Sequence, residues 1–111
     1  MKSKSSPARQ TLIRQAEVFK ALGHVGRMAI VHALREGPVC ACELAEAAGC
    51  SPSTTSRHLS VLRQAGVIED ERRGQQIFYH LACPCVLDFA ACINRVDAGA
   101  EHVTLCEACA S

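Results

Sequence analysis

Two cysteines separated by one residue, Cys40 and Cys42, are the side chains of this sequence best suited to do chemistry. Gly37 and Pro38 precede them, which predicts that the pair lies at the start of a helix. Residues two apart face away from each other on a regular helix, but a distorted first turn would let both sulfurs reach one ion. Thiolates select soft ions, and a helix N-terminus lowers the pKa of a thiol. The pair is therefore predicted to bind a soft metal or metalloid.

The chain has eight cysteines in 111 residues, and the other six could supply further ligands. Cys106 and Cys109 have the spacing of a chelating pair, so we rank them next after the first pair. The weaker candidate metal ligands are Cys83, Cys85 and Cys92. The last two of these share a helix face but lie about 10 Å apart, too far to bind one ion within a single helix. Cys50 is expected to be a small buried residue.

Composition places these thiols in a reducing compartment. No apolar run approaches the roughly 20 residues of a membrane-spanning helix, and the first ten residues do not have the pattern of a secretory signal. We therefore expect a cytoplasmic protein without a membrane partner, whose thiols bind soft metals or sense redox state. Residues 1–81 hold 11 Lys and Arg against 7 Asp and Glu, and residues 82–111 hold 1 against 4. A basic body with an acidic tail is compatible with a nucleic-acid ligand.

Helices and one hairpin are expected to position these residues. Apolar spacing predicts helices over residues 9–21, 25–35, 40–48, 52–65 and 84–96. Two β-prone runs, 67–68 and 76–81, are joined by a polar turn over 69–75, which predicts a hairpin. This order predicts an α+β, mostly α, winged helix-turn-helix with a two-stranded wing.

Three regions of the chain are expected to differ in character. Residues 1–8 form a flexible basic arm, residues 9–96 the DNA-binding and dimerisation domain, and residues 97–111 a cysteine-containing C-terminal tail. With three Phe, one Tyr and no Trp, the domain has a thin core. Burying further surface in a homodimer would compensate for this.

The helix predicted over residues 52–65 has the pattern of a DNA-reading helix. Ser51 is suited to cap it and Pro52 to occupy its first position. At 100° per residue, Thr55, Leu59 and Leu62 face the core and leave a polar arc outside. Small hydroxyl side chains let a helix approach the major groove, and an arginine there can pair with guanine. The predicted DNA contacts are Ser53, Thr54, Ser56, Arg57, Ser60 and Arg63, with Arg72, Arg73 and Gln75 at the wing tip.

Residues 19–81 resemble the ArsR/SmtB metalloregulatory repressors. The resemblance lies in Lys20-Ala21-Leu22-Gly23-His24, in Cys40-Ala41-Cys42-Glu43-Leu44-Ala45, in Ser51-Pro52-Ser53-Thr54-Thr55-Ser56-Arg57-His58-Leu59 and in Arg72-Arg73-Gly74-Gln75-Gln76-Ile77-Phe78-Tyr79-His80-Leu81. It implies a homodimer paired through its first and last helices. Such a dimer represses an operon from a double-stranded DNA operator, expected to be an inverted repeat, until an inducer binds.

The resemblance also bears on the inducer. The zinc- and nickel-sensing members carry an Asp-x-His pair on the last helix, whereas here Asp88 is followed by Phe89 and Ala90. This favours As(III) or Sb(III), which take three thiolates, over Cd(II), Pb(II) or Zn(II). The arsenic-repressor pattern places a third cysteine three residues after the second, where this chain has Ala45. The third thiolate must therefore come from elsewhere in the chain.

Three other functions compete with an ion-responsive repressor. In the first, the same fold is a thiol-based sensor of oxidants or reactive sulfur species. In the second, Cys83, Cys85, Cys106 and Cys109 hold a structural zinc ion, although the first pair has a shorter spacer than zinc ribbons use. The third is a cysteine-dependent enzyme, which we do not favour because no pattern supplies a phosphate loop or an oxyanion hole.

Overall fold

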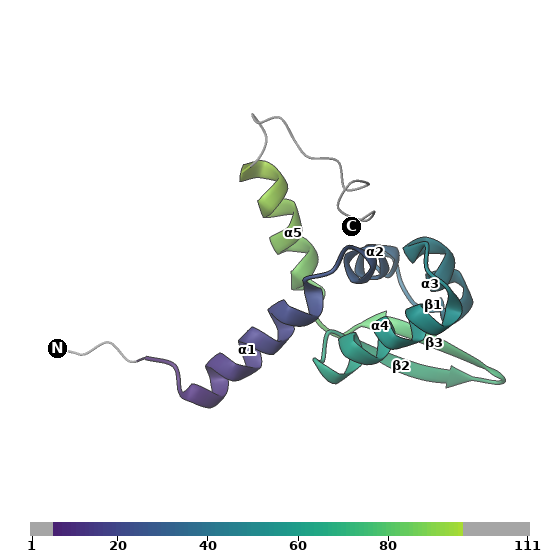
Figure 1. The fold of residues 1–111 in the computed structure, drawn as a ribbon, viewed down its shortest axis with the longest axis horizontal. Helices are drawn as coiled ribbons and strands as arrows, with labels where there is room; N and C mark the ends of the chain where they lie inside the picture. The colour runs from purple at the N-terminus through teal and green to yellow at the C-terminus, as the bar shows by residue number, and fades with distance from the viewer. Residues whose placement is uncertain (1–5, 97–111) are drawn as a thin grey trace.

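The fold is a mostly helical α+β winged helix-turn-helix, as predicted (Figure 1). The computed structural model describes residues 6–96. Its elements are α1 (Arg9–Leu22), α2 (Val25–Ala33), β1 (Val39–Cys40), α3 (Ala41–Ala48), α4 (Pro52–Gln64), β2 (Ile68–Arg73), β3 (Gln76–Leu81) and α5 (Cys85–Val96). No helix within residues 6–96 has the length and apolar character needed to cross a membrane.

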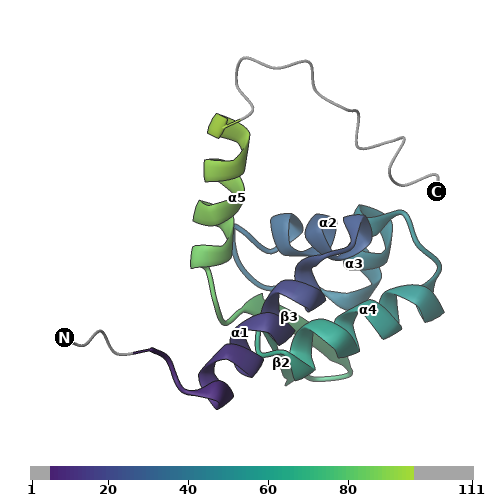
Figure 2. The same cartoon turned by 60° about the vertical axis from the view of Figure 1, so that its left-hand side comes forward.

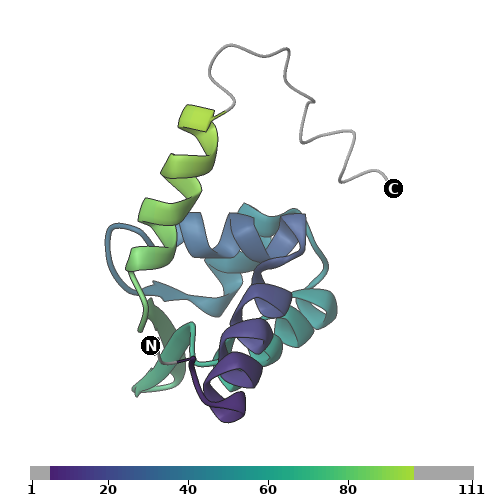
Figure 3. The ribbon, with the colours of Figure 1, turned by 90° about the vertical axis from the view of Figure 1, so that its left-hand side faces the viewer.

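The helices α2, α3 and α4 and the hairpin form the body of the molecule, while α1 and α5 extend from it (Figures 1 and 2). When the molecule is turned by 90°, α5 still stands clear of α4 and of the wing (Figure 3). The α1 helix is attached to the body because the Arg14 guanidinium donates a hydrogen bond to the carbonyl oxygen of Ala65, the C-cap of α4. The α1 helix, one of the two helices predicted to pair in the dimer, is thus linked directly to the end of the predicted DNA-reading helix.

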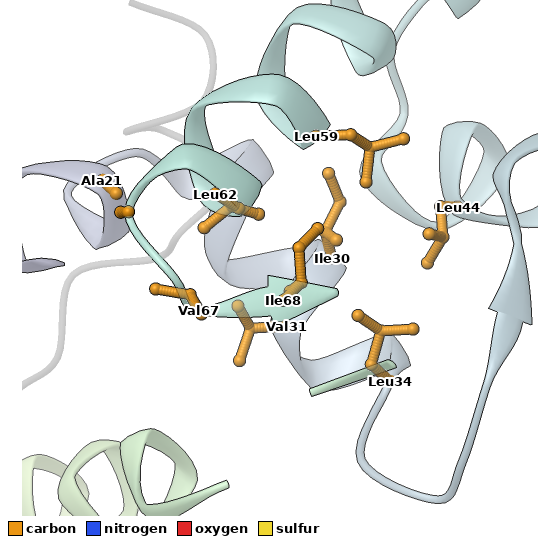
Figure 4. Packing of buried hydrophobic residues seen from close by; sticks show 10 residues of the cluster. Ala21, Ile30, Val31, Leu34, Leu44, Leu59, Leu62, Val67 and Ile68 are labelled. Atoms are coloured by element: carbon orange, nitrogen blue, oxygen red, sulfur yellow. The ribbon is translucent and has the colours of Figure 1, made fainter. Parts of the chain in front are cut away.

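The core lies where α2, α3, α4 and the start of β2 meet (Figure 4). Ile30, Leu44 and Leu62 have no exposed surface, and they come from three different helices. Thr55 and Leu59 are also buried, so the predicted inward face of α4 is confirmed. Burial of this apolar surface is what holds α3 against α4.

The sheet has three strands in the order β1-β3-β2, one more than predicted. The additional strand pairs Val39 with Tyr79 and Cys40 with Phe78. Two residues are too short to give an alternating apolar pattern, so no sequence signal could separate β1 from the helix that follows.

The wing hairpin is also longer than predicted. The segment expected to be a turn over residues 69–75 is mostly strand, since β2 runs to Arg73 and pairs that residue with Gln76. Only Gly74 and Gln75 remain in the turn, and Gly74 has a φ of 62° that favours glycine. The charged residues of β2 are exposed, so their polarity reflects a solvated strand rather than a loop.

Candidate nucleic-acid interface and dithiol site

The predicted DNA-reading helix begins with a side-chain cap. The Ser51 hydroxyl accepts a hydrogen bond from the Thr54 amide at 3.2 Å, and Pro52 occupies the first helical turn. Ser51 also contacts the Thr54 hydroxyl at 3.1 Å and the Ser53 hydroxyl at 3.3 Å. The hydroxyl groups at this end of α4 are therefore gathered where helix N-H groups favour a phosphate oxygen.

The outward arc of α4 is accessible along its length. Ser53, Ser56 and Arg57 are exposed, whereas Thr54 and Ser60 are half-buried. Arg63 is exposed as well, but its guanidinium lies 4.0 Å from the Asp70 carboxylate on β2. Arg63 therefore has a competing partner within the protein, and Arg57 is the better placed of the two to pair with a base.

The predicted wing contacts lie at the exposed end of the hairpin. Arg72, Arg73 and Gln75 all face solvent. The Arg73 guanidinium already has partners within the protein. It lies 3.3 Å from a Glu71 carboxylate oxygen and stacks 4.9 Å from the centre of the Phe78 ring. Arg72 has no such contact among residues 6–96, which leaves it available for a DNA phosphate.

A histidine cluster, missed by the sequence analysis except for His58, joins α4 to the region before α2. The His58 ring lies 4.5 Å from the ring of His24, and its Nδ1 is 3.2 Å from the Arg27 guanidinium. His58 is buried, so its side chain packs inside the protein and does not face the predicted DNA surface. Burial, followed by the neighbouring His24 ring and the positive charges of Arg27 and Arg57, lowers the pKa of His58. The cluster therefore packs α4 against the start of α2 through a side chain that resists protonation.

The sulfur atoms of Cys40 and Cys42 lie 3.1 Å apart. Cys40 is the buried last residue of β1 and the N-cap of α3, and Cys42 is exposed in the first turn. The pair therefore lies at the start of a helix, as predicted, although α3 begins one residue later than expected. Cys40 has extended backbone, which lets the two sulfurs approach.

The two thiols of this pair differ in acidity. The hydrogen bond with Cys42, supported by the Glu43 backbone amide, lowers the pKa of Cys40. The same hydrogen bond raises the pKa of Cys42. The pair therefore has one thiol prepared to ionise first, with the second sulfur beside it.

The remaining cysteines do not complete a site with this pair in the described part of the chain. Cys83 and Cys85 are near each other, with their sulfurs 3.6 Å apart before and at the start of α5, and Cys92 is exposed farther along α5. Cys50 is half-buried rather than fully buried. Within residues 6–96 no group of three or more His, Cys, Asp or Glu side chains could hold one ion. Cys106 and Cys109 lie outside the described residues.

A hollow of about 290 Å³ lies beside Cys42, between α3, α4 and β3. Ala45 lines it from α3, Thr55 and Leu59 line it from α4, and Tyr79 lines it from β3. Thr55 is 2% exposed, yet its hydroxyl has no hydrogen-bond partner among the described residues. This hollow could not be predicted from the sequence, because its walls come from three segments that are far apart in the chain.

Large apolar side chains on α1 and α5 are left uncovered. On α1 these are Leu12, Ile13 and Phe19, and on α5 they are Phe89 and Ile93, each 40% to 57% exposed. Phe19 and Phe89 meet edge to face, with ring centres 5.8 Å apart, so the two helices share one apolar surface. Surfaces of this kind commonly mark sites of protein association.

Comparison with known proteins agrees with this geometry. Residues 24–70 match the family model for the "Bacterial regulatory protein, arsR family". The chain is 40% identical over 76 residues to the HTH-type transcriptional repressor SmtB of Mycobacterium tuberculosis, covering 68% of this chain and 56% of that protein. It is 46% identical over 66 residues to the arsenic resistance transcriptional regulator ArsR1 of Pseudomonas putida, covering 58% and 51%. The chain thus spans about half the length of these curated relatives.

A solved structure resembles the whole described fold. It is the homodimeric winged helix-turn-helix DNA-binding domain of a possible ArsR-family transcriptional regulator from Mycobacterium bovis. The two share a TM-score of 0.72 at 25% sequence identity, over 93% of this chain and 100% of that one.

Proposed function

Because this chain belongs to the ArsR/SmtB family of bacterial regulatory proteins, we propose that it is a DNA-binding transcriptional repressor released by a thiophilic ion. The observation that carries this proposal is the Cys40 and Cys42 pair, 3.1 Å apart, beside a hollow that α4 also lines. A ligand on these sulfurs would therefore sit next to the helix that reads DNA. No enzymatic activity is part of the proposal.

The DNA-binding form is a homodimer paired through α1 and α5. The exposed apolar residues of these helices support this pairing, and the similar domain from Mycobacterium bovis is homodimeric. A symmetric dimer presents two copies of α4, which must lie about 34 Å apart to enter successive major grooves. We therefore expect a double-stranded operator with inverted-repeat symmetry. Its DNA ligand places the repressor in the cytoplasm.

The favoured inducer is As(III) or Sb(III), with Cd(II), Pb(II) or Zn(II) as alternatives. A soft ion suits the paired sulfurs, and one of the relatives of this chain is an arsenic resistance transcriptional regulator. The tail residues Cys106 and Cys109 are our candidates for completing the site, ahead of Cys83, Cys85 and Cys92. Binding would pull on the start of α3 and tilt α4, which changes the spacing of the two recognition helices. A coupling free energy of about 1–3 kcal/mol at each of two sites is enough to release DNA.

The test is fluorescence anisotropy of the reduced protein on its own promoter fragment, titrated with As(III). We expect release of the wild type, no release of the Cys40→Ser/Cys42→Ser variant, and an intermediate response of Cys106→Ser/Cys109→Ser if the tail completes the site. Cys50→Ser, which removes a thiol that is not among the candidate ligands, serves as a matched control. Wild type that stays on DNA with As(III), Sb(III), Cd(II), Pb(II) and Zn(II) would contradict the ion-responsive function.

A thiol-based redox or reactive-sulfur sensor is the second candidate function. The Cys40 and Cys42 sulfurs need to move by about 1 Å to reach the disulfide bond length of about 2.05 Å. If this function holds, a peroxide or a persulfide takes two electrons and two protons from the thiol pair and DNA is released. The released protein is then lighter by two hydrogen atoms, and dithiothreitol restores binding. An ion-responsive repressor would instead be released under fully reducing conditions.

A further inference from the structure

The described part of the dithiol site does not fit an ion that needs three thiolates. Two sulfurs are present, and within residues 6–96 no third Cys, His, Asp or Glu group joins them. Ala45, one helical turn after Cys42, has only a methyl group to offer. Where a third ligand would approach from α3, the structure has the hollow of about 290 Å³ instead.

We infer, on the basis of the proposed function, that Cys40 and Cys42 bind a trivalent arsenical carrying one organic substituent, and that the substituent occupies the hollow beside Cys42. Such a compound, R–As(OH)₂, already has an As–C bond and needs only two thiolates. Two S–As bonds form and two As–OH bonds break. The two thiol protons leave with the hydroxide groups as two water molecules, and arsenic remains trivalent throughout.

The hollow is suited to an apolar substituent in size and lining. An engineered cavity of about 150 Å³ is large enough to bind benzene, so a hollow of about 290 Å³ can accept a phenyl group. Its walls include the side chains of Ala45, Leu59 and Ile77 and the ring of Tyr79.

The position of the hollow explains how its occupant could act on DNA binding. Pro52, Thr55, Ser56 and Leu59 of α4 form one of its walls. Ser56 also belongs to the outward arc predicted to contact DNA. A substituent held by sulfurs on one wall therefore presses on the recognition helix that forms the other wall.

The experiment measures how tightly the full-length reduced protein retains three probes: phenylarsine oxide, methylarsenite and inorganic arsenite. Affinity is measured by competition with dithiothreitol, and native mass spectrometry counts the arsenic atoms bound. Each measurement is repeated in the Cys106→Ser/Cys109→Ser background, which removes the tail thiols. The informative variants are Cys40→Ser/Cys42→Ser, Ala45→Cys and Ala45→Leu, each checked by thermal melting.

In the tail-substituted background we expect phenylarsine oxide to bind about tenfold more tightly than arsenite, as burial of about 60 Å² of the ring would give. The Ala45→Leu side chain fills the hollow, so it should weaken the phenyl compound about tenfold and leave the methyl compound unchanged. Ala45→Cys supplies a third thiolate and should raise arsenite affinity at least tenfold. Loss of both cysteines should abolish retention of all three probes at this site.

Two results would overturn the inference: arsenite bound as tightly as phenylarsine oxide without the tail thiols, or a phenyl preference that Ala45→Leu does not change. Operator release separates this failure from failure of the proposed function. If arsenite releases wild type but phenylarsine oxide shows no preference for Cys40 and Cys42 without the tail thiols, the repressor function stands and the substituent site is wrong. If no probe reaches Cys40 and Cys42 while the protein still binds its operator, the inference and the metalloid effector both fail.

Discussion

Replacing Arg57 by alanine tests the DNA-reading surface without disturbing the fold. Arg57 is exposed on α4 and makes no hydrogen bond or ion pair with another of the residues 6–96. The Arg57 side chain faces solvent, whereas the next residue, His58, is buried. The substitution therefore removes only solvent-facing atoms of α4. The free energy of unfolding should therefore change by less than about 0.5 kcal/mol.

The expected loss of operator affinity follows from the contact and from the symmetry. A bidentate arginine–guanine contact discriminates by about 1–3 kcal/mol. A homodimer presents two copies of Arg57, one at each half-site, so the variant should lose about 2–6 kcal/mol. At the lower limit this is a loss of about 30-fold in affinity.

Anisotropy titrations on operator and scrambled DNA, from about 50 to about 200 mM salt, separate two ways in which Arg57 could bind. A base contact predicts a larger loss on the operator than on scrambled DNA, with little change in salt dependence. A phosphate contact predicts equal losses and a salt slope reduced by about one per contact. Arg35→Ala, at an exposed position outside the predicted DNA contacts and the pairing helices, is the matched control for the loss of one positive charge. An Arg57→Ala variant that binds the operator as tightly as this control would refute the placement of α4 in the groove.

Three further substitutions test the fold and the helix that it positions. Leu62→Ala removes a fully buried side chain and should cost about 2–5 kcal/mol, visible as a lower urea midpoint. Ser51→Ala removes the cap of α4 and should cost about 1 kcal/mol, with weaker operator binding; a Ser51→Asp variant that restores stability would attribute the loss to the cap. Burial first, and then nearby positive charges, lower the pKa of His58, so the unfolded chain binds that proton more readily. Stability should therefore be steady above about pH 6.5 and fall as the pH drops below it, and urea midpoints of His58→Gln should show a shallower fall. An equal slope in both proteins would contradict the role assigned to His58.

Much of the fold follows from local patterns in the sequence. The α4 helix was predictable because Ser51 and Pro52 form a cap and a first turn, and because Thr55, Leu59 and Leu62 recur on one face. The wing strand β3 was predictable because its residues are β-prone. The strand β1 and the full length of β2 were not, since these depend on pairing with β3 across the sheet rather than on their own residues.

The dithiol was predictable as a pair, but its geometry was not. The Cys-x-Cys spacing indicated a soft-ion site, whereas the extended backbone at Cys40 comes from its pairing with Phe78. The hollow beside Ala45 and the His24, Arg27 and His58 cluster depend on contacts between distant segments. Tertiary contacts of this kind leave no periodic signal in the chain.

The pairing of Cys40 with Phe78 couples the dithiol site to the wing. Cys40 is hydrogen-bonded into the sheet beside β3 and is also the N-cap of α3, so a rotation of its backbone would move both elements. The distance from Phe78 to the tip consists of two residues of strand, as far as Gln76, and the turn at Gly74 beyond them, together about 10 Å. A rotation of the hairpin by about 5° at Cys40 would move the tip of the wing by about 1 Å. This is enough to lengthen a hydrogen bond between the wing and DNA beyond normal hydrogen-bond distance. A ligand bound by Cys40 could thus weaken the proposed DNA contacts of the wing as well as those of α4.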